Sequence, residues 1–185
     1  MKSFVFCHRS TRSFCKWKAI GLLSSALLPW LTPSSCEAQE TRFLSQGYIF
    51  VSPGILAHEQ TVFGTVGFGG GGERFVSRKL AVGAEIGYLK IFGSPPYVHD
   101  PGNSFGLVCL NASYVKPTVK KLAPFIIGGY SLGFGDGTAS FINIGGGVTW
   151  WAKKRTGIRF ELRDHFYPDD CNDHFLGLRI GLAFR

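Results

Sequence analysis

The chain has 185 residues, enough for one domain, of which 45% are hydrophobic and only 17% are charged. Outside the N-terminus it contains no run of about 18 apolar residues, which argues against a helical membrane protein. The formal net charge is +8. No basic helix or RNA-binding motif accompanies this charge, so nucleic-acid binding is not expected.

Residues 1–38 are predicted to form a secretory signal peptide. Five basic residues lie among the first 18 positions, Ala19–Leu31 is apolar, and Cys36-Glu37-Ala38 supplies residues suited to the positions before a cut. Cys36 also suggests a lipoprotein, with lipid attached to this cysteine, but the residues before it lack the Leu-rich box of such proteins. Removing this segment leaves 15 basic and 11 acidic residues, a net charge of +4. Only Cys109 and Cys171 then remain, too few for a disulfide framework.

After a short lead at 39–46, the sequence predicts a barrel domain at 47–185 that consists of β-strands with no amphipathic helix to cover them. Turn residues such as Pro53-Gly54 and Gly135-Asp136-Gly137 separate the strands. Most strands are long enough to cross a membrane when tilted, which takes about 9–11 residues. The expected strands are 47–53, 62–75, 80–91, 104–115, 123–133, 139–151, 157–166 and 175–184.

The last two predicted strands alternate most clearly. Between Ile158 and Phe166, apolar residues alternate with Arg159, Glu161, Arg163 and His165, and only Asp164 breaks the apolar set. In the final strand Leu176, Leu178, Ile180, Leu182 and Phe184 alternate with Gly177, Arg179, Gly181 and Ala183. Because successive side chains of a strand point to opposite faces, each strand has one apolar face. If the apolar faces contact lipid, the strands belong to a membrane barrel. If they pack on a protein core, the strands belong to a soluble sheet.

Charge alternates over the connections between the predicted strands. In an up-and-down meander, alternate connections lie at opposite ends of the barrel. The sequence therefore predicts one basic rim and one acidic rim. The connections after the second, fourth and sixth strands carry Arg78, Lys79, Lys116, Lys120, Lys121, Lys153, Lys154 and Arg155. Those after the first, third, fifth and seventh carry Glu59, Asp100, Asp136, Asp169, Asp170 and Asp173.

Three aromatic residues precede basic connections. Tyr114 comes just before the connection at 116–122, and Trp150 and Trp151 come just before the one at 152–156. Aromatic residues at strand ends form the interfacial girdles of membrane barrels. We therefore expect all three at a lipid–water interface, with ordinary core aromatics as the alternative.

Residues from about 43 to 185 resemble the small eight-stranded outer-membrane β-barrel family of Gram-negative bacteria, the outer-membrane-protein-A-like group. The resemblance is carried by the alternating segment GIRFELRDHF and by the terminal strand LGLRIGLAF, in which Phe184 is penultimate. It implies an all-β, eight-stranded antiparallel up-and-down transmembrane β-barrel in the cell outer membrane. It also implies a monomer, outer-membrane lipid around it, and assembly by the barrel-assembly machinery through Phe184. Both termini are expected in the periplasm, because the number of strands is even and export delivers the N-terminus there. No cofactor is expected.

An eight-stranded barrel has an interior just wide enough for its own side chains. The residues that alternate with the lipid-facing set therefore meet inside. Buried charge is tolerated only when it is paired and hydrogen-bonded, so a structural salt-bridge network is expected to fill the lumen. A binding or proton-transfer site is the alternative. The expected members are Glu85, Arg159, Glu161, Arg163 and Arg179, with Asn111 and Asn143 as neutral partners.

Two other classes of protein are weighed against this non-catalytic barrel. Some eight-stranded barrels are lipid A deacylases, which resemble this chain but place a Ser two residues after a His. Here that position, after His165, is Tyr167, and Ser131 and Ser140 lie on other strands. A soluble lipocalin-like binder would instead have the apolar face inside. No catalytic residue is expected.

The last loop carries possible metal ligands, Asp169, Asp170, Cys171, Asp173 and His174. Their spacing matches no established metal site, so a solvated loop is expected and no metal is assigned.

Overall fold

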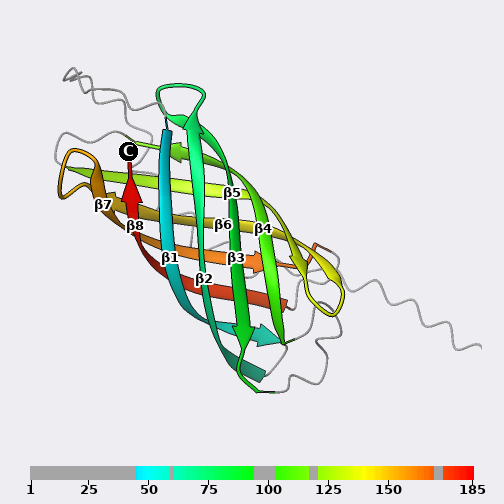
Figure 1. The fold of residues 1–185 in the computed structure, drawn as a ribbon. Coiled ribbons are helices and arrows are strands. Elements are labelled where there is room, and N and C mark those ends of the chain that lie inside the picture. The colour runs from blue at the N-terminus through cyan, green and yellow to red at the C-terminus, as the bar shows by residue number, and fades with distance from the viewer. Residues whose placement is uncertain (1–44, 59–60, 94–102, 117–120, 169–172) are drawn as a thin grey trace, which may run out of the picture. The chain divides into compact units, whose positions relative to one another are not determined.

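The computed structural model describes residues 45–58, 61–93, 103–116, 121–168 and 173–185 (Figure 1). The predicted signal peptide at 1–38 lies outside these residues. In the described part of the chain, no helix is long and apolar enough to cross a membrane. Eight strands follow one another in the order β1 (Ser45–His58), β2 (Thr61–Phe75), β3 (Leu80–Ile91), β4 (Ser104–Val115), β5 (Leu122–Phe134), β6 (Thr138–Trp150), β7 (Thr156–Phe166) and β8 (Asp173–Phe184).

Each strand pairs antiparallel with its sequence neighbour, and β8 pairs back onto β1 to close the barrel (Figure 1). The row of paired residues that starts at Gln46 on β1 passes Glu73, Asn143 and His165 and returns to β1 at Leu56, ten residues further on. Such a stagger requires strands that are tilted against the barrel axis. The prediction of an eight-stranded antiparallel up-and-down barrel is confirmed.

The outer wall of the barrel is apolar. Ile86 and Leu110 are each 63% exposed, and the whole apolar set of β8 points outward. A soluble lipocalin-like binder would need that set inside, so the structure excludes this alternative. Large exposed apolar surfaces mark contact with a partner or a membrane. The outward residues of β8 are Leu176, Leu178, Ile180, Leu182 and Phe184.

One end of the barrel is basic. The connections after β2, β4 and β6 lie at this end, together with the start of β1 and the end of β8. We refer to it as the basic end. Of the acidic residues expected at the opposite end, Asp136 is exposed in the turn after β5, whereas several others lie outside the described residues. The exposed basic residues of the described connections include Arg78, Lys79, Lys153, Lys154 and Arg155.

The predicted bounds of the first strand were wrong. β1 begins at Ser45 and continues through the expected turn at Pro53-Gly54 to His58. Pairing with β2 runs through Pro53, whereas pairing with β8 skips Ser52 and Pro53. Proline lacks only the N–H, so it interrupts one ladder and leaves the strand intact.

Gly54 serves close packing and not a turn. A Cβ at this position would meet the carbonyl oxygen of Leu176 and lie 2.9 Å from the Thr65 hydroxyl oxygen. Asp173, which was expected in the last loop, is the first residue of β8.

Two adjacent glycines of β5 give a matched test of the faces. A Cβ at inward Gly129 would clash with the backbone carbonyl oxygen of Leu110 and lie 2.6 Å from Asn111 Oδ1, whereas one at Gly128 would lie 3.5 Å from the nearest atom, the carbonyl oxygen of Asn143. We expect Gly129→Ala to lower the free energy of unfolding by about 1–3 kcal/mol because of overpacking. Gly128→Ala should change it by less than about 0.5 kcal/mol. Urea titration of the barrel refolded into lipid vesicles measures both, and equal midpoints would contradict this assignment of faces.

Candidate functional site

Three glutamates and three arginines of the described residues meet in the lumen. They come from β2, β3, β7 and β8, and none is more than 6% exposed. Their formal charges cancel, which favours burial because each charge has an opposite partner. The structure brings together all five charged residues expected from the sequence and adds Glu73. The set is Glu73, Glu85, Arg159, Glu161, Arg163 and Arg179.

Glu161 lies at the centre of this charge network. It accepts hydrogen bonds from Arg159 Nε at 3.0 Å and from Arg163 Nε at 2.6 Å. Arg179 Nη1 lies 3.5 Å from the same carboxylate. Arg159, Glu161 and Arg163 alternate along β7, so their side chains all point inward. One carboxylate therefore holds all three guanidinium groups together.

Glu85 links the network to β1 and β8. Its Oε1 accepts from Arg179 Nη1 at 2.6 Å, and its Oε2 accepts from the Tyr48 hydroxyl at 2.9 Å. Arg163 Nη2 lies 3.8 Å from Oε2. Both oxygens of this buried carboxylate are therefore engaged.

Glu73 is the network member that sequence reasoning missed. Its Oε1 accepts from Arg159 Nη1 at 2.9 Å, and its Oε2 accepts from the Ser113 hydroxyl at 2.6 Å. Glu73 follows a run of glycines, which have no side chain to mark a face, so alternation could not distinguish Glu73 from Arg74. The signal that could have found it is charge balance, because three inward arginines require a third acid.

Asparagine side chains extend the network to the opposite wall. Asn143 Oδ1 accepts from Arg163 Nη1 at 3.1 Å, and its Nδ2 donates to Asn111 Oδ1 at 3.0 Å and to Ser131 Oγ at 2.8 Å. The neutral partners expected from the sequence, Asn111 and Asn143, are thus both joined to the charged residues.

Aromatic rings cover the guanidinium groups. Arg159 lies over the rings of Tyr48 at 4.4 Å and Phe125 at 3.9 Å, and Arg179 lies over Phe50 at 4.3 Å. A guanidinium over an aromatic face is attracted by the ring quadrupole, most strongly where water is absent. The rings therefore stabilise the arginines and fill the space beside them.

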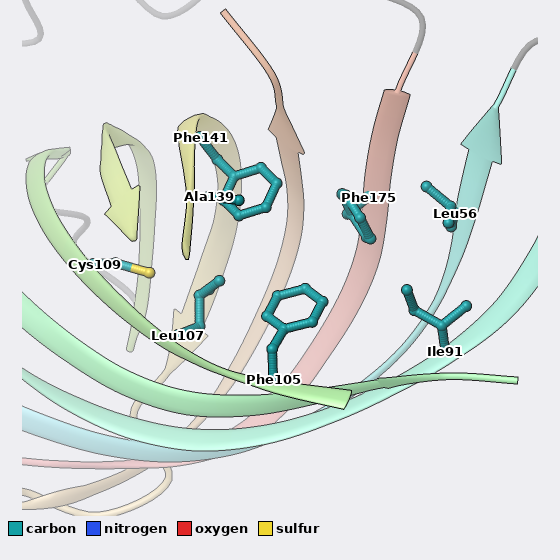
Figure 2. Packing of buried hydrophobic residues seen from close by; sticks show 8 residues of the cluster. All are labelled: Leu56, Ile91, Phe105, Leu107, Cys109, Ala139, Phe141 and Phe175. Carbon is teal, nitrogen blue, oxygen red and sulfur yellow. The ribbon is translucent and has the colours of Figure 1, made fainter. Parts of the chain in front are cut away.

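Apolar side chains fill the lumen at the end opposite the basic end. Figure 2 shows that they come from β1, β3, β4, β6 and β8 and point toward one another. The rings of Phe105, Phe141 and Phe175 lie within 6.2 Å of one another, measured between centroids. We refer to this cluster as the apolar plug. Its buried members are Leu56, Ile91, Phe105, Leu107, Cys109, Ala139, Phe141 and Phe175.

Trp151 lies inside the barrel at the basic end, so the expectation that it is an interfacial aromatic was wrong. It is 6% exposed and packs against Tyr48, and the Arg185 guanidinium lies 3.6 Å from the centroid of its ring. Trp151 directly follows Trp150, whose side chain points outward, so the side chain of Trp151 points inward. Trp150 and Tyr114 are 46% and 40% exposed on the outer wall. Their place at a lipid–water interface stays a prediction.

The described residues do not assemble a serine site around His165. His165 Nε2 lies 3.2 Å from Arg179 Nη2 in the lumen. The Tyr167 ring packs against a phenylalanine of the apolar plug. Ser131 is hydrogen-bonded to an asparagine and Ser140 to a tyrosine, and in the described part of the chain no such bond joins either serine to His165.

Asp164 faces the outer wall near the end of β7. Its Oδ2 lies 2.8 Å from Nδ1 of His174, the second residue of β8. A carboxylate on an apolar wall needs a polar partner, and this histidine supplies one. The possible metal ligands Asp169, Asp170 and Cys171 of the same loop lie outside the described residues.

The closed fold, the apolar outer wall and the lumen filled by the charge network and the apolar plug define a small eight-stranded β-barrel of the outer-membrane type. No protein-family model matches the sequence, and a search of curated proteins finds no match. Among solved structures, the chain is similar to Neisserial surface protein A (NspA), with a TM-score of 0.63 and 11% identity over 77% of this chain and 97% of that one. It is also similar to Ail, the attachment invasion locus protein of Yersinia pestis, with a TM-score of 0.56 and 11% identity over 76% and 96%.

A de novo designed transmembrane β-barrel is similar as well, with a TM-score of 0.51 and 14% identity over 79% of this chain and 98% of that one. These likenesses confirm the family resemblance at the level of the fold.

Replacing Glu161 tests the charge network. Glu161→Ala leaves three arginines to share two carboxylates, and breaking a buried pair costs about 3–5 kcal/mol. Asp136→Ala, in an exposed turn, is the control and should change the free energy of unfolding by less than about 0.5 kcal/mol. Urea titrations in detergent micelles compare the two. A midpoint for Glu161→Ala that equals that of the parent would mean that water solvates the remaining arginines.

Proposed function

We propose that the protein is a non-catalytic outer-membrane β-barrel with a filled polar lumen, which has a structural or surface-interaction role. The observation that carries this proposal is the sorting of side chains, with apolar residues outward and a paired charge network inward. Such a barrel satisfies its backbone hydrogen bonds without water, as a membrane requires. Of the similar natural proteins, one is called a surface protein and another an attachment invasion locus protein, which supports a role at the cell surface.

We propose that the basic end faces the periplasm. The start of β1 pairs with the end of β8 there, through Gly47 and Phe184, so both ends of the barrel domain emerge on one side. Export delivers the N-terminus to the periplasm, which supports this orientation. The basic rim would then meet anionic headgroups of the inner leaflet, an attraction of about 1 kcal/mol per Lys or Arg near such a surface.

The proposed partners are outer-membrane lipid and the barrel-assembly machinery, with no nucleic acid and no cofactor. Phe184 is 43% exposed on the outer wall at the end of β8, where a terminal strand could be read during assembly. A monomer is proposed because one chain closes the barrel and supplies both members of every pair in the charge network.

Fractionation tests the membrane assignment. We expect the protein in the outer-membrane fraction. Unboiled and boiled samples in SDS should migrate differently, because a closed strand ladder has no edge at which detergent can open it. Release into the soluble periplasm together with identical migration would contradict the proposal.

A matched control separates the proposed assembly role of Phe184 from the effect of losing any exposed phenylalanine at a strand end. Phe134 at the end of β5 is also 43% exposed on the outer wall, so it is a matched control. We expect Phe184→Ala to reduce the folded yield in outer membranes several-fold, and more than either Phe134→Ala or deletion of Arg185. Quantifying the heat-modifiable band measures this yield. Equal losses for the two phenylalanine variants would mean that Phe184 acts only as a lipid-facing aromatic.

A further inference from the structure

Four exposed cations gather where the β6–β7 turn meets the start of β5. Lys153, Lys154 and Arg155 follow one another in the turn. Lys121 lies beside them, because its carbonyl oxygen accepts a hydrogen bond from the Trp151 N–H at 2.7 Å. In the described part of the chain, no carboxylate forms an ion pair with any of the four, and no Asp or Glu side chain is exposed at the basic end. We refer to these four residues as the cation cluster.

The backbone at Lys121 is an unusual place for a lysine. Its φ of 50° lies in the left-handed region, and among the described residues no other residue except a glycine has a positive φ. Glycine adopts this conformation without steric cost, whereas a side chain strains the backbone there. Backbone strain of this kind concentrates at functional sites. The chain therefore carries a positive charge at a position where glycine would fit without strain.

An apolar surface adjoins the cation cluster on the outer wall. Trp150 is 46% exposed at the end of β6, where it pairs with Leu122 of β5 and Ile158 of β7. Phe184 pairs with Thr156, the residue directly after the cation cluster, and is also exposed. Indole rings favour the level of the lipid headgroups. A lipid whose acyl chains lie against this surface therefore brings its headgroup to the cation cluster.

We infer that the cation cluster and the adjoining apolar surface bind one phospholipid that carries two phosphates. Basic pockets at membrane surfaces recognise headgroups of this kind. Two phosphates match the cluster better than one, because a single phosphate would leave most of the four positive charges uncompensated. The site rests on the proposed placement of the barrel in a membrane. It goes beyond a general attraction between the basic rim and anionic lipid, because it selects a lipid by its pair of phosphates and not by total charge.

Quenching of tryptophan fluorescence measures this selection. Trp150 and Trp151 are the only tryptophans after the predicted signal peptide. Trp151 is buried in the lumen, so Trp150 reports on the neighbouring lipid. The mature protein is reconstituted into phosphatidylcholine vesicles that contain either brominated cardiolipin, which has two phosphates, or brominated phosphatidylglycerol, which has one. The two kinds of vesicle are equal in total phosphate and in brominated chains. We expect several-fold stronger quenching by cardiolipin.

Variants separate lipid binding from folding. Lys154→Gln removes one charge from the cation cluster and should lose most of the preference for cardiolipin. Lys79→Gln removes the same charge from the exposed β2–β3 turn at the same end of the barrel, and it should keep the preference. Lys121→Gly should also lose most of the preference, but its urea midpoint in neutral detergent micelles should stay the same or rise, because glycine relieves the strain.

Equal quenching by the two lipids would overturn the site in favour of diffuse attraction to the whole rim, and so would equal losses in Lys154→Gln and Lys79→Gln. A lower urea midpoint for Lys121→Gly would overturn the role of this lysine in the site. Heat-modifiable migration shows whether the protein has inserted into the vesicles. A protein that inserted into neither kind would overturn the proposed function and the site with it, whereas an inserted protein without a preference would overturn the site alone.

Discussion

The contact of Glu161 with three arginines is the interaction on which the rest of the lumen depends. Eight strands enclose a space that their own side chains fill, so charge can point inward only where each group has an opposite partner. The three glutamates and three arginines meet that condition together. The apolar plug at one end and Trp151 at the other close the lumen around them. The outer wall is apolar because successive side chains of a strand point to opposite faces, so the residues between the inward ones face outward.

Much of this arrangement could be predicted because a strand has a period of two. Once Leu178 and Ile180 face outward, Arg179 must face inward, and the same reasoning placed Glu85 and the charged residues of β7. The prediction failed where alternation carries no information. The glycines before Glu73 mark neither face. Pro53-Gly54 has the composition of a turn, but here it lies where β1 closely approaches β8.

The apolar plug could not be predicted for a related reason. In β4, the parity of Asn111, which was expected inside, also places Phe105 and Leu107 inward. Alternation within one strand does not show, however, that inward apolar residues of different strands meet, and only the register between neighbouring strands brings them together at one end of the lumen. Trp151 shows the same limit, because two consecutive tryptophans necessarily point to opposite faces, and the sequence does not say which one faces lipid.

Single-channel recording tests the central claim, that side chains fill the lumen from end to end, most directly. The refolded protein is inserted into a planar lipid bilayer under an applied voltage in concentrated potassium chloride. With the charge network and the apolar plug in place, no continuous water path crosses the barrel, so the account predicts no discrete current steps. Stable, reproducible steps from the folded parent protein would contradict it, because ions would then pass through a hydrated lumen.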